Sequence, residues 1–195
     1  MEIKDLMGLK ESAVEVKYTS IRDIIKIPLT RQNQKTFSFI ASAISDDETR
    51  IFLHGVLLQH NYMIATDGRR MHVYMGEEFE YTTFGIAKPH IDKVSATCKF
   101  YDAQFPRFQR VIPEISENGK TENLKYYKCH GICQFIYNLS KHGFVFNDTY
   151  LKDLVKYSSE WCAYFTEVEY AVVFESMGNV PKVYAVIMPI KVSDA

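Results

Sequence analysis

Tyr62-Met-Ile-Ala-Thr-Asp-Gly-Arg-Arg-Met71, which follows the apolar run Arg50-Ile-Phe-Leu-His-Gly-Val-Leu-Leu58, is the stretch that decides the fold. Apolar residues lead into Thr-Asp-Gly, where the chain turns, and two adjacent arginines precede another apolar run. The pattern predicts consecutive strands over residues 50–58, 62–66 and 70–75. Such a turn places polar and cationic groups at the end of a sheet, so the function depends on which partner these groups contact.

Two segments have the periodicity of amphipathic helices. In the first, apolar residues recur at i, i+3, i+4 and i+7, as Phe37, Ile40, Ala41 and Ile44. In the second, Asn147 or Asp148 is expected to cap a helix over residues 149–157. Its apolar face consists of Leu151, Leu154 and Val155.

The remaining segments are less regular. Further strands are predicted over residues 14–18, 24–30, 79–86, 144–146, 162–166, 170–175 and 183–192. Residues 105–113 are bracketed by prolines and expected to be extended, and residues 114–122 are expected to form an exposed loop. Residues 87–102 have no assignable pattern, and residues 125–142 fit either a helix or a strand. Because the order of strand, helix and several strands occurs twice, we expect an α+β fold with antiparallel sheets and two β-α-β-β-β half-repeats.

Composition indicates a globular protein of nearly neutral charge. The chain has 195 residues, of which 47% are hydrophobic and 24% charged, and its formal net charge is -1. Any contact with nucleic acid must therefore use local positive charge. No apolar run approaches the roughly 20 residues of a membrane span, and the charged N-terminus does not resemble a signal peptide. We expect a cytoplasmic protein.

The cysteines and histidines predict neither a metal site nor a cofactor. The four cysteines are scattered, apart from a C-x3-C pair (Cys129 and Cys133) around His130. A zinc site usually needs two close pairs of ligands, so reduced thiols are the preferred interpretation.

Five segments, in order, resemble the bacterial DNA polymerase III β subunit, the sliding clamp. Arg50 to Leu58 with Ala65 to Met71 resembles its "R-x-x-L-x-G-V … A-T-D-G-H-R-L" signature. The others are Phe105-Pro-Arg-Phe-Gln-Arg-Val-Ile-Pro113, Phe146-Asn-Asp-Thr-Tyr-Leu-Lys-Asp-Leu154 and Val186-Ile-Met-Pro-Ile-Lys-Val192. Together they cover less than a quarter of the chain. Arg69 stands where the family usually has His.

The resemblance implies a DNA-clamp-like fold, but this chain lacks room for the family's three domains. We expect residues 1–195 to form one clamp-like domain, with halves at about 23–100 and 101–195 and an extension at 1–22. Two strongly trimmed clamp domains are the alternative.

The resemblance also implies two binding surfaces and no catalytic activity. A groove for linear peptides of polymerase or repair proteins is expected at Thr66, Gly68, Arg69, Arg70, Met71, Pro113, Asn147, Tyr150, Val186 and Met188. Non-specific contact with DNA, inside an oligomeric ring, is expected from Arg31, Lys35, Lys152 and Lys156.

Two other interpretations remain open. A monomeric, clamp-related adaptor would bind peptides without encircling DNA. An enzyme is the rival class, because Asp67, His54, His60 and His72 cluster in sequence near strand ends. Against it, the chain has no Gly-rich phosphate loop, no H-E-x-x-H and no G-x-S-x-G.

Overall fold

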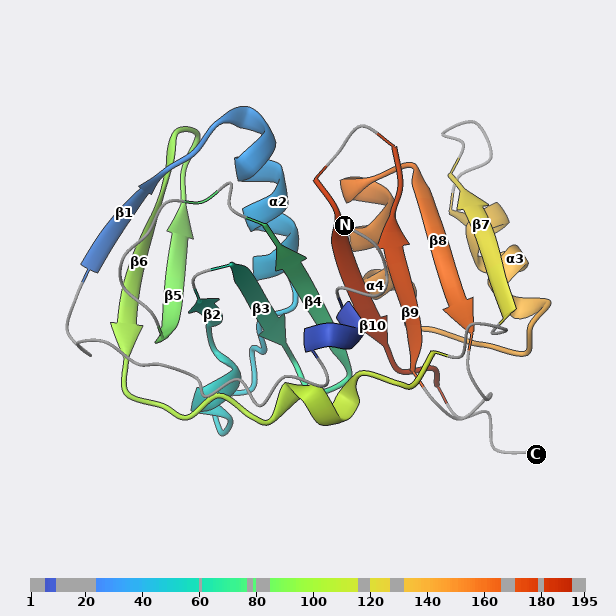
Figure 1. The fold of residues 1–195 in the computed structure, drawn as a ribbon, viewed down its shortest axis with the longest axis horizontal. Coiled ribbons are helices and arrows are strands. Elements are labelled where there is room, and N and C mark those ends of the chain that lie inside the picture. Colours follow the sequence, from blue (N-terminus) through green and yellow to red (C-terminus); the bar gives the residue numbers. More distant parts are fainter. Residues whose placement is uncertain are drawn as a thin grey trace. The chain divides into compact units, whose positions relative to one another are not determined.

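The computed structural model describes residues 6–9, 24–59, 61–76, 79, 85–115, 120–126, 132–165, 171–178 and 181–190. The chain forms two compact units (Figure 1). One unit is Ser12–Phe108, called here the N-terminal unit. The other combines Met1–Glu11 with Gln109–Ala195 and is called the C-terminal unit. The strand expected at 14–18, His60, Cys129 and His130 lie outside the described residues.

The N-terminal unit is an antiparallel sheet with one long helix. Its elements are β1 (Ile24–Pro28), α2 (Arg31–Ala41), η1 (Ile51–Leu53), β2 (Val56–Gln59), β3 (Tyr62–Thr66), β4 (Arg70–Met75), β5 (Gly85–Ile91) and β6 (Ser95–Tyr101). The strands lie in the order β1-β6-β5-β2-β3-β4. The predicted strands at 62–66 and 70–75 are confirmed at both ends, and the predicted helical face is buried at Phe37 and Ile40.

The start of α2 is fixed by a side-chain cap. Thr30 has an extended backbone, and its hydroxyl accepts a hydrogen bond from the Asn33 amide at 3.2 Å. Such a cap satisfies one of the amides that the first turn of a helix leaves without a backbone partner. The helix therefore begins at Arg31, so the polar residues ahead of Phe37 belong to it.

Two strand predictions in this unit are wrong in part. Residues 51–53 form the 3-10 helix η1, and β2 begins only at Val56. A Cβ on Gly55 would lie 2.7 Å from the Ala87 carbonyl oxygen, so the backbone here approaches β5 too closely for a side chain. The strand expected at 79–86 begins at Gly85 instead, while Phe79 packs edge-on against Phe37 and Tyr74 outside any strand.

The unassigned residues 87–102 form the hairpin of β5 and β6. Its turn is held by Asp92, whose carboxylate accepts hydrogen bonds from the amides of Val94 and Ser95 at 2.8 and 2.7 Å. These hydrogen bonds, with a smaller contribution from the charge of Lys26, lower the pKa of Asp92. β6 then pairs with β1, which is the edge strand of this sheet.

The C-terminal unit is a second antiparallel sheet. The short helix η2 (Phe108–Val111) begins at the last residue of the N-terminal unit. The other elements of the C-terminal unit are β7 (Lys120–Lys125), α3 (Cys133–Ser140), α4 (Asp148–Tyr157), β8 (Glu160–Phe165), β9 (Val172–Ser176) and β10 (Val183–Ile187). The strands lie in the order β10-β9-β8-β7. Residues 6–9 are helical, belong to this unit, and bury Leu6 and Leu9.

One face of this sheet packs against α4. The indole of Trp161, fully buried, donates hydrogen bonds to the carbonyls of Leu154 and Ser158 at 3.1 and 3.0 Å. On the other face, the buried carboxylate of Glu175 accepts hydrogen bonds from Tyr164 and Lys182, each at 2.7 Å. These bonds satisfy a charge that burial would otherwise make costly.

Three predictions for this unit need correction. The segment 105–113, expected to be extended, contains the short helix η2. β7 begins at Lys120, inside the segment 114–122 expected to be a loop. Residues 144–146 form no strand, although the Val145 carbonyl accepts a hydrogen bond from the Ile190 amide at 2.7 Å. The ambiguous residues 125–142 contain a helix, α3.

The predicted α+β class is confirmed. Each unit contains one strand, a helix and three strands in that order, as β1-α2-β2-β3-β4 and as β7-α4-β8-β9-β10. The N-terminal unit adds the β5–β6 hairpin, and the C-terminal unit adds α3 before α4. Among the described residues, no helix is long and apolar enough to cross a membrane.

Candidate functional site: the turn after β3 and two helix faces

The turn between β3 and β4 is built from hydrogen bonds within the segment 66–70. The Thr66 hydroxyl donates to the Arg70 carbonyl at 2.6 Å and accepts from the Gly68 amide at 3.1 Å. The Asp67 carboxylate accepts from the amides of Arg69 and Arg70 at 2.8 and 2.9 Å. Gly68 has a φ of +89°, which a side chain would disfavour. The Thr-Asp-Gly sequence thus forms a turn that is stabilised by hydrogen bonds within the segment.

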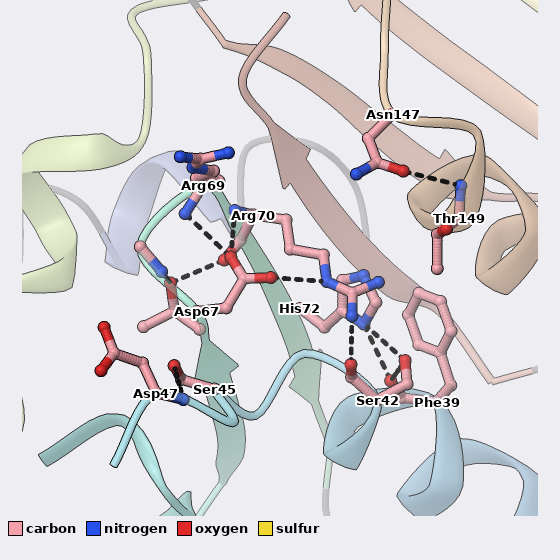
Figure 2. A network of polar contacts seen from close by, with 12 residues as sticks. Phe39, Ser42, Ser45, Asp47, Asp67, Arg69, Arg70, His72, Asn147 and Thr149 are labelled. Carbon is pink, nitrogen blue, oxygen red and sulfur yellow. Dashed lines mark hydrogen bonds and ion pairs between the residues drawn. The ribbon is translucent and has the colours of Figure 1, made fainter. Parts of the chain in front are cut away.

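The two arginines of this turn have different surroundings (Figure 2). The Arg70 guanidinium is only 8% exposed, forms an ion pair with Asp67 at 3.1 Å, and donates to the carbonyl of Ser42. It therefore ties the turn to the end of α2. Arg69 is exposed, and its side chain points away from this network. Of the two cations predicted for a peptide groove, Arg69 is the one that is open to solvent.

A buried histidine lies beside this network. The His72 ring stacks on Phe39, with ring centres 4.1 Å apart, and its Nδ1 donates to the Phe39 carbonyl at 2.8 Å. Burial lowers the pKa of His72 to about 3, and the charge of Arg70 acts in the same direction against the effect of the Phe39 hydrogen bond. The ring is therefore neutral at physiological pH and packs as part of the core.

The groove residues expected in the C-terminal unit lie on different elements. Asn147 caps α4, its side chain accepting from the Thr149 amide at 2.9 Å, and Tyr150 is half-buried in the first turn. Pro113 is half-buried just after η2. Val186 is buried in β10, whereas Met188 is 45% exposed beyond the end of that strand.

An exposed apolar cluster adjoins these residues, and sequence reasoning missed it. Val145 and Ile190, joined by a backbone hydrogen bond, are 44% and 52% exposed, and Met188 lies two positions from Ile190. Several exposed apolar side chains close together are typical of a protein-binding surface. The motif Val186-Ile-Met-Pro-Ile190 contains the apolar residues Met188 and Ile190 of this cluster, but its sequence pattern predicts a strand there.

The helix cations predicted to meet DNA are all exposed. Arg31 and Lys35 are four residues apart on α2, and α2 contains no Asp or Glu. On α4, the Lys152 ammonium pairs with Asp148 at 2.8 Å, and this hydrogen bond and charge lower the pKa of Asp148. With Asp148 and Asp153 opposing Lys152 and Lys156, the formal charge of α4 is zero, so α2 is the more cationic helix.

His54, Asp67 and His72, the residues of the enzyme interpretation that the structure describes, each have a structural contact or a buried position. His54 lies outside the strand predicted for it and donates from Nε2 to the Asp47 carbonyl at 2.6 Å. The Asp67 carboxylate forms an ion pair with Arg70, and His72 is buried. Burial raises the pKa of Cys98 to about 12 and also raises that of Cys162, so both thiols stay protonated. In the described part of the chain, no three His, Cys, Asp or Glu residues are grouped to hold a metal.

No protein-family model and no curated protein matches this sequence. Solved structures do match its fold. A C. crescentus β sliding clamp matches with a TM-score of 0.61 and 16% identity, over 92% of this chain and 69% of that one. DNA polymerase III β subunits from Thermotoga maritima (TM-score 0.57) and Streptococcus pneumoniae (TM-score 0.60) each match at 16% identity over 94% of this chain, and over 70% and 68% of theirs. The chain therefore has the predicted DNA-clamp-like fold.

Proposed function

We propose that this chain is a sliding-clamp-like processivity protein. It associates with DNA as an oligomer, binds linear peptides of polymerase or repair partners, and catalyses no reaction. The observation that carries this proposal is the clamp fold over about nine-tenths of the chain. We further propose that the two units are the halves of one clamp-like domain, with two trimmed domains as the alternative.

The DNA-binding part of the proposal is supported by the charge on α2. A clamp that slides needs cations that meet phosphates without reading bases. Arg31 and Lys35 are exposed on the helix face opposite the buried Phe37 and Ile40. Lys152 and Lys156 on α4 have the same arrangement but are offset by acidic neighbours.

The peptide-binding part is supported by two sets of groups. Arg69 offers an exposed cation on a hydrogen-bonded turn, and Met188 offers an exposed, adaptable apolar side chain. Linear peptides are usually bound by an apolar surface with a few orienting polar groups. Pro113, Asn147, Tyr150 and Val186 remain the proposed neighbours of Met188 in this role.

The test is whether DNA topology controls binding. The full chain is loaded onto nicked circular duplex DNA, separated from free protein by gel filtration, and then treated with a restriction enzyme that linearises the circle. A ring is retained on the circle and is lost when the DNA has ends. Equal retention on circular and linear DNA would mean that the chain binds DNA without encircling it.

The monomeric peptide-binding adaptor is the second candidate, and the neutrality of α4 favours it. If only α2 carries net positive charge, the surface available to DNA is small. An adaptor would not be retained on circular DNA, but a peptide library would still select binders whose affinity falls in Met188→Glu.

A further inference from the structure

The sheet of the N-terminal unit carries a basic face made from its three outer strands. In the strand register, Lys99 lies opposite Lys88 on one side and Ile24 on the other. Two residues along, Thr97 lies opposite His90 and Lys26. Directly opposed residues in antiparallel strands point to the same face. Lys26, Lys88, His90 and Lys99 therefore share one surface, called here the lysine face.

The lysine face is open to solvent. All four of its cationic or titratable side chains are exposed, whereas the alternate residues of the same strands are buried, among them Ile27, Ala87, Ala96, Cys98 and Phe100. α2 packs against β3, β4 and β5. Since Lys88 and His90 of β5 are exposed, α2 covers the other face of the sheet. The lysine face and the cations of α2 consequently lie on opposite sides.

The charges on this face are not balanced within the sheet. β1, β5 and β6 contain no Asp or Glu. Neither Lys88 nor Lys99 forms an ion pair with any residue that the structure describes. Lys26 interacts electrostatically with the carboxylate of Asp92, but that carboxylate is held chiefly by hydrogen bonds from Val94 and Ser95. Like charges directly opposite each other destabilise a sheet, so Lys88 and Lys99 carry a cost that a bound anion would offset.

Aromatic and apolar side chains border the same face. Tyr101 continues the alternation of Thr97 and Lys99, so it points to the same side of β6. Its hydroxyl donates to the Ile51 carbonyl at 3.2 Å, which places η1 at the end of the lysine face. η1 presents Ile51 and Phe52, which are 59% and 40% exposed.

We propose that the lysine face binds single-stranded nucleic acid. Lysines that track the backbone, together with an aromatic ring on which a base can stack, are the two features that bind single strands without sequence preference. Lys26, Lys88 and Lys99 contact phosphates, and Phe52 stacks a base. This site lies across the sheet from α2, so single-stranded and duplex nucleic acid have separate surfaces.

The test measures binding of fluorescein-labelled dT20 to the full chain by anisotropy across a salt series. The triple variant Lys26→Gln/Lys88→Gln/Lys99→Gln is expected to bind at least 10-fold more weakly. Its plot of log affinity against log salt should flatten by about 2, since each lost phosphate contact removes about 0.7. Phe52→Ala should weaken binding at least 5-fold with an unchanged salt slope. Unchanged dT20 affinity in the triple variant would overturn the proposal.

Two controls separate binding from folding and from the proposed clamp function. Lys88→Glu places opposite charges across the strands, so its urea midpoint should equal or exceed that of the parent while its dT20 affinity falls. Arg31→Gln/Lys35→Gln should leave dT20 affinity within about twofold, because those cations lie on the other side. Retention on circular duplex DNA is expected to depend on α2 and not on the lysine face. Unchanged dT20 affinity in the triple variant would therefore leave the proposed clamp function standing, and failure of the retention test would leave the lysine-face proposal standing. If a polyglutamate peptide displaces dT20 while Phe52→Ala has no effect, the face binds an acidic protein and the nucleic-acid proposal is wrong.

Discussion

At the scale of single residues, the adjacent arginines of the β3–β4 turn show how neighbours in sequence acquire different roles. Arg70 is buried between Asp67 and the Ser42 carbonyl, and Arg69 is exposed. The sequence identified the turn, but it could not separate the two arginines. Their difference depends on the position of Ser42, which is 28 residues away along the chain.

Arg70→Met is expected to lower the free energy of unfolding by about 2–4 kcal/mol. The change leaves the Asp67 carboxylate, largely buried, without its cation and removes a donor from Ser42. The matched variant Arg69→Met should change stability by no more than about 0.5 kcal/mol, because its side chain is exposed. Urea unfolding followed by circular dichroism checks both. Equal losses in the two variants would contradict the assignment.

His72 makes stability depend on pH. Its pKa is about 3 in the folded chain, against an ordinary value of about 6.5 when unfolded. Between these values the unfolded state binds a proton that the folded state excludes, so stability falls as pH decreases. The slope from this group reaches about 1.4 kcal/mol per pH unit.

The measurement is the unfolding free energy between pH 7 and about pH 5.5, a range that lies more than one pH unit above the ordinary pKa values of Asp and Glu. His72→Gln removes the titrating group, so its stability should vary less steeply with pH even if its stability at pH 7 is lower. A slope unchanged in His72→Gln would assign the pH dependence to other residues.

At the scale of elements, sequence reasoning succeeded where one pattern ran uninterrupted. β3 and β4 are almost wholly buried and match the predicted strands at both ends, and the cap of α4 is Asn147, one of the two residues (Asn147 and Asp148) that the sequence offers for it. β5 and β6 were missed because one face of the hairpin is polar, with Lys88, His90 and Lys99, and because Pro89 interrupts a strand pattern. η1 differs from the predicted strand because its three residues are an apolar run too short for its periodicity to separate a strand from a helical turn.

The charge difference between α2 and α4 predicts unequal effects on duplex DNA binding. Arg31→Glu/Lys35→Glu should weaken binding at least 10-fold and flatten the salt dependence by about 2, at about 0.9 per phosphate contact. Lys152→Glu/Lys156→Glu should have a smaller effect, since Asp148 and Asp153 already oppose those lysines. Anisotropy with a labelled duplex at several salt concentrations checks the comparison. A larger effect from α4 would contradict it.

At the scale of the whole molecule, the proposed function requires an oligomer of this chain. The chain has a mass of 22.6 kDa, and we expect light scattering of its complex with duplex DNA to give, once the mass of the DNA is subtracted, at least twice that mass. A mass of one chain both with and without DNA, together with no DNA affinity, would exclude the ring and favour the adaptor.

The C-terminal unit contains both the earliest and the latest residues of the chain, whereas the N-terminal unit is contiguous. During synthesis, Ser12–Phe108 can fold as soon as it leaves the ribosome. Residues 6–9, with their two buried leucines, must wait until the chain beyond Gln109 has been made. Contacts between such distant segments form slowly because a long loop must close first. We therefore expect Leu6 and Leu9 to be exposed in the nascent chain and to dock as one of the last steps of folding.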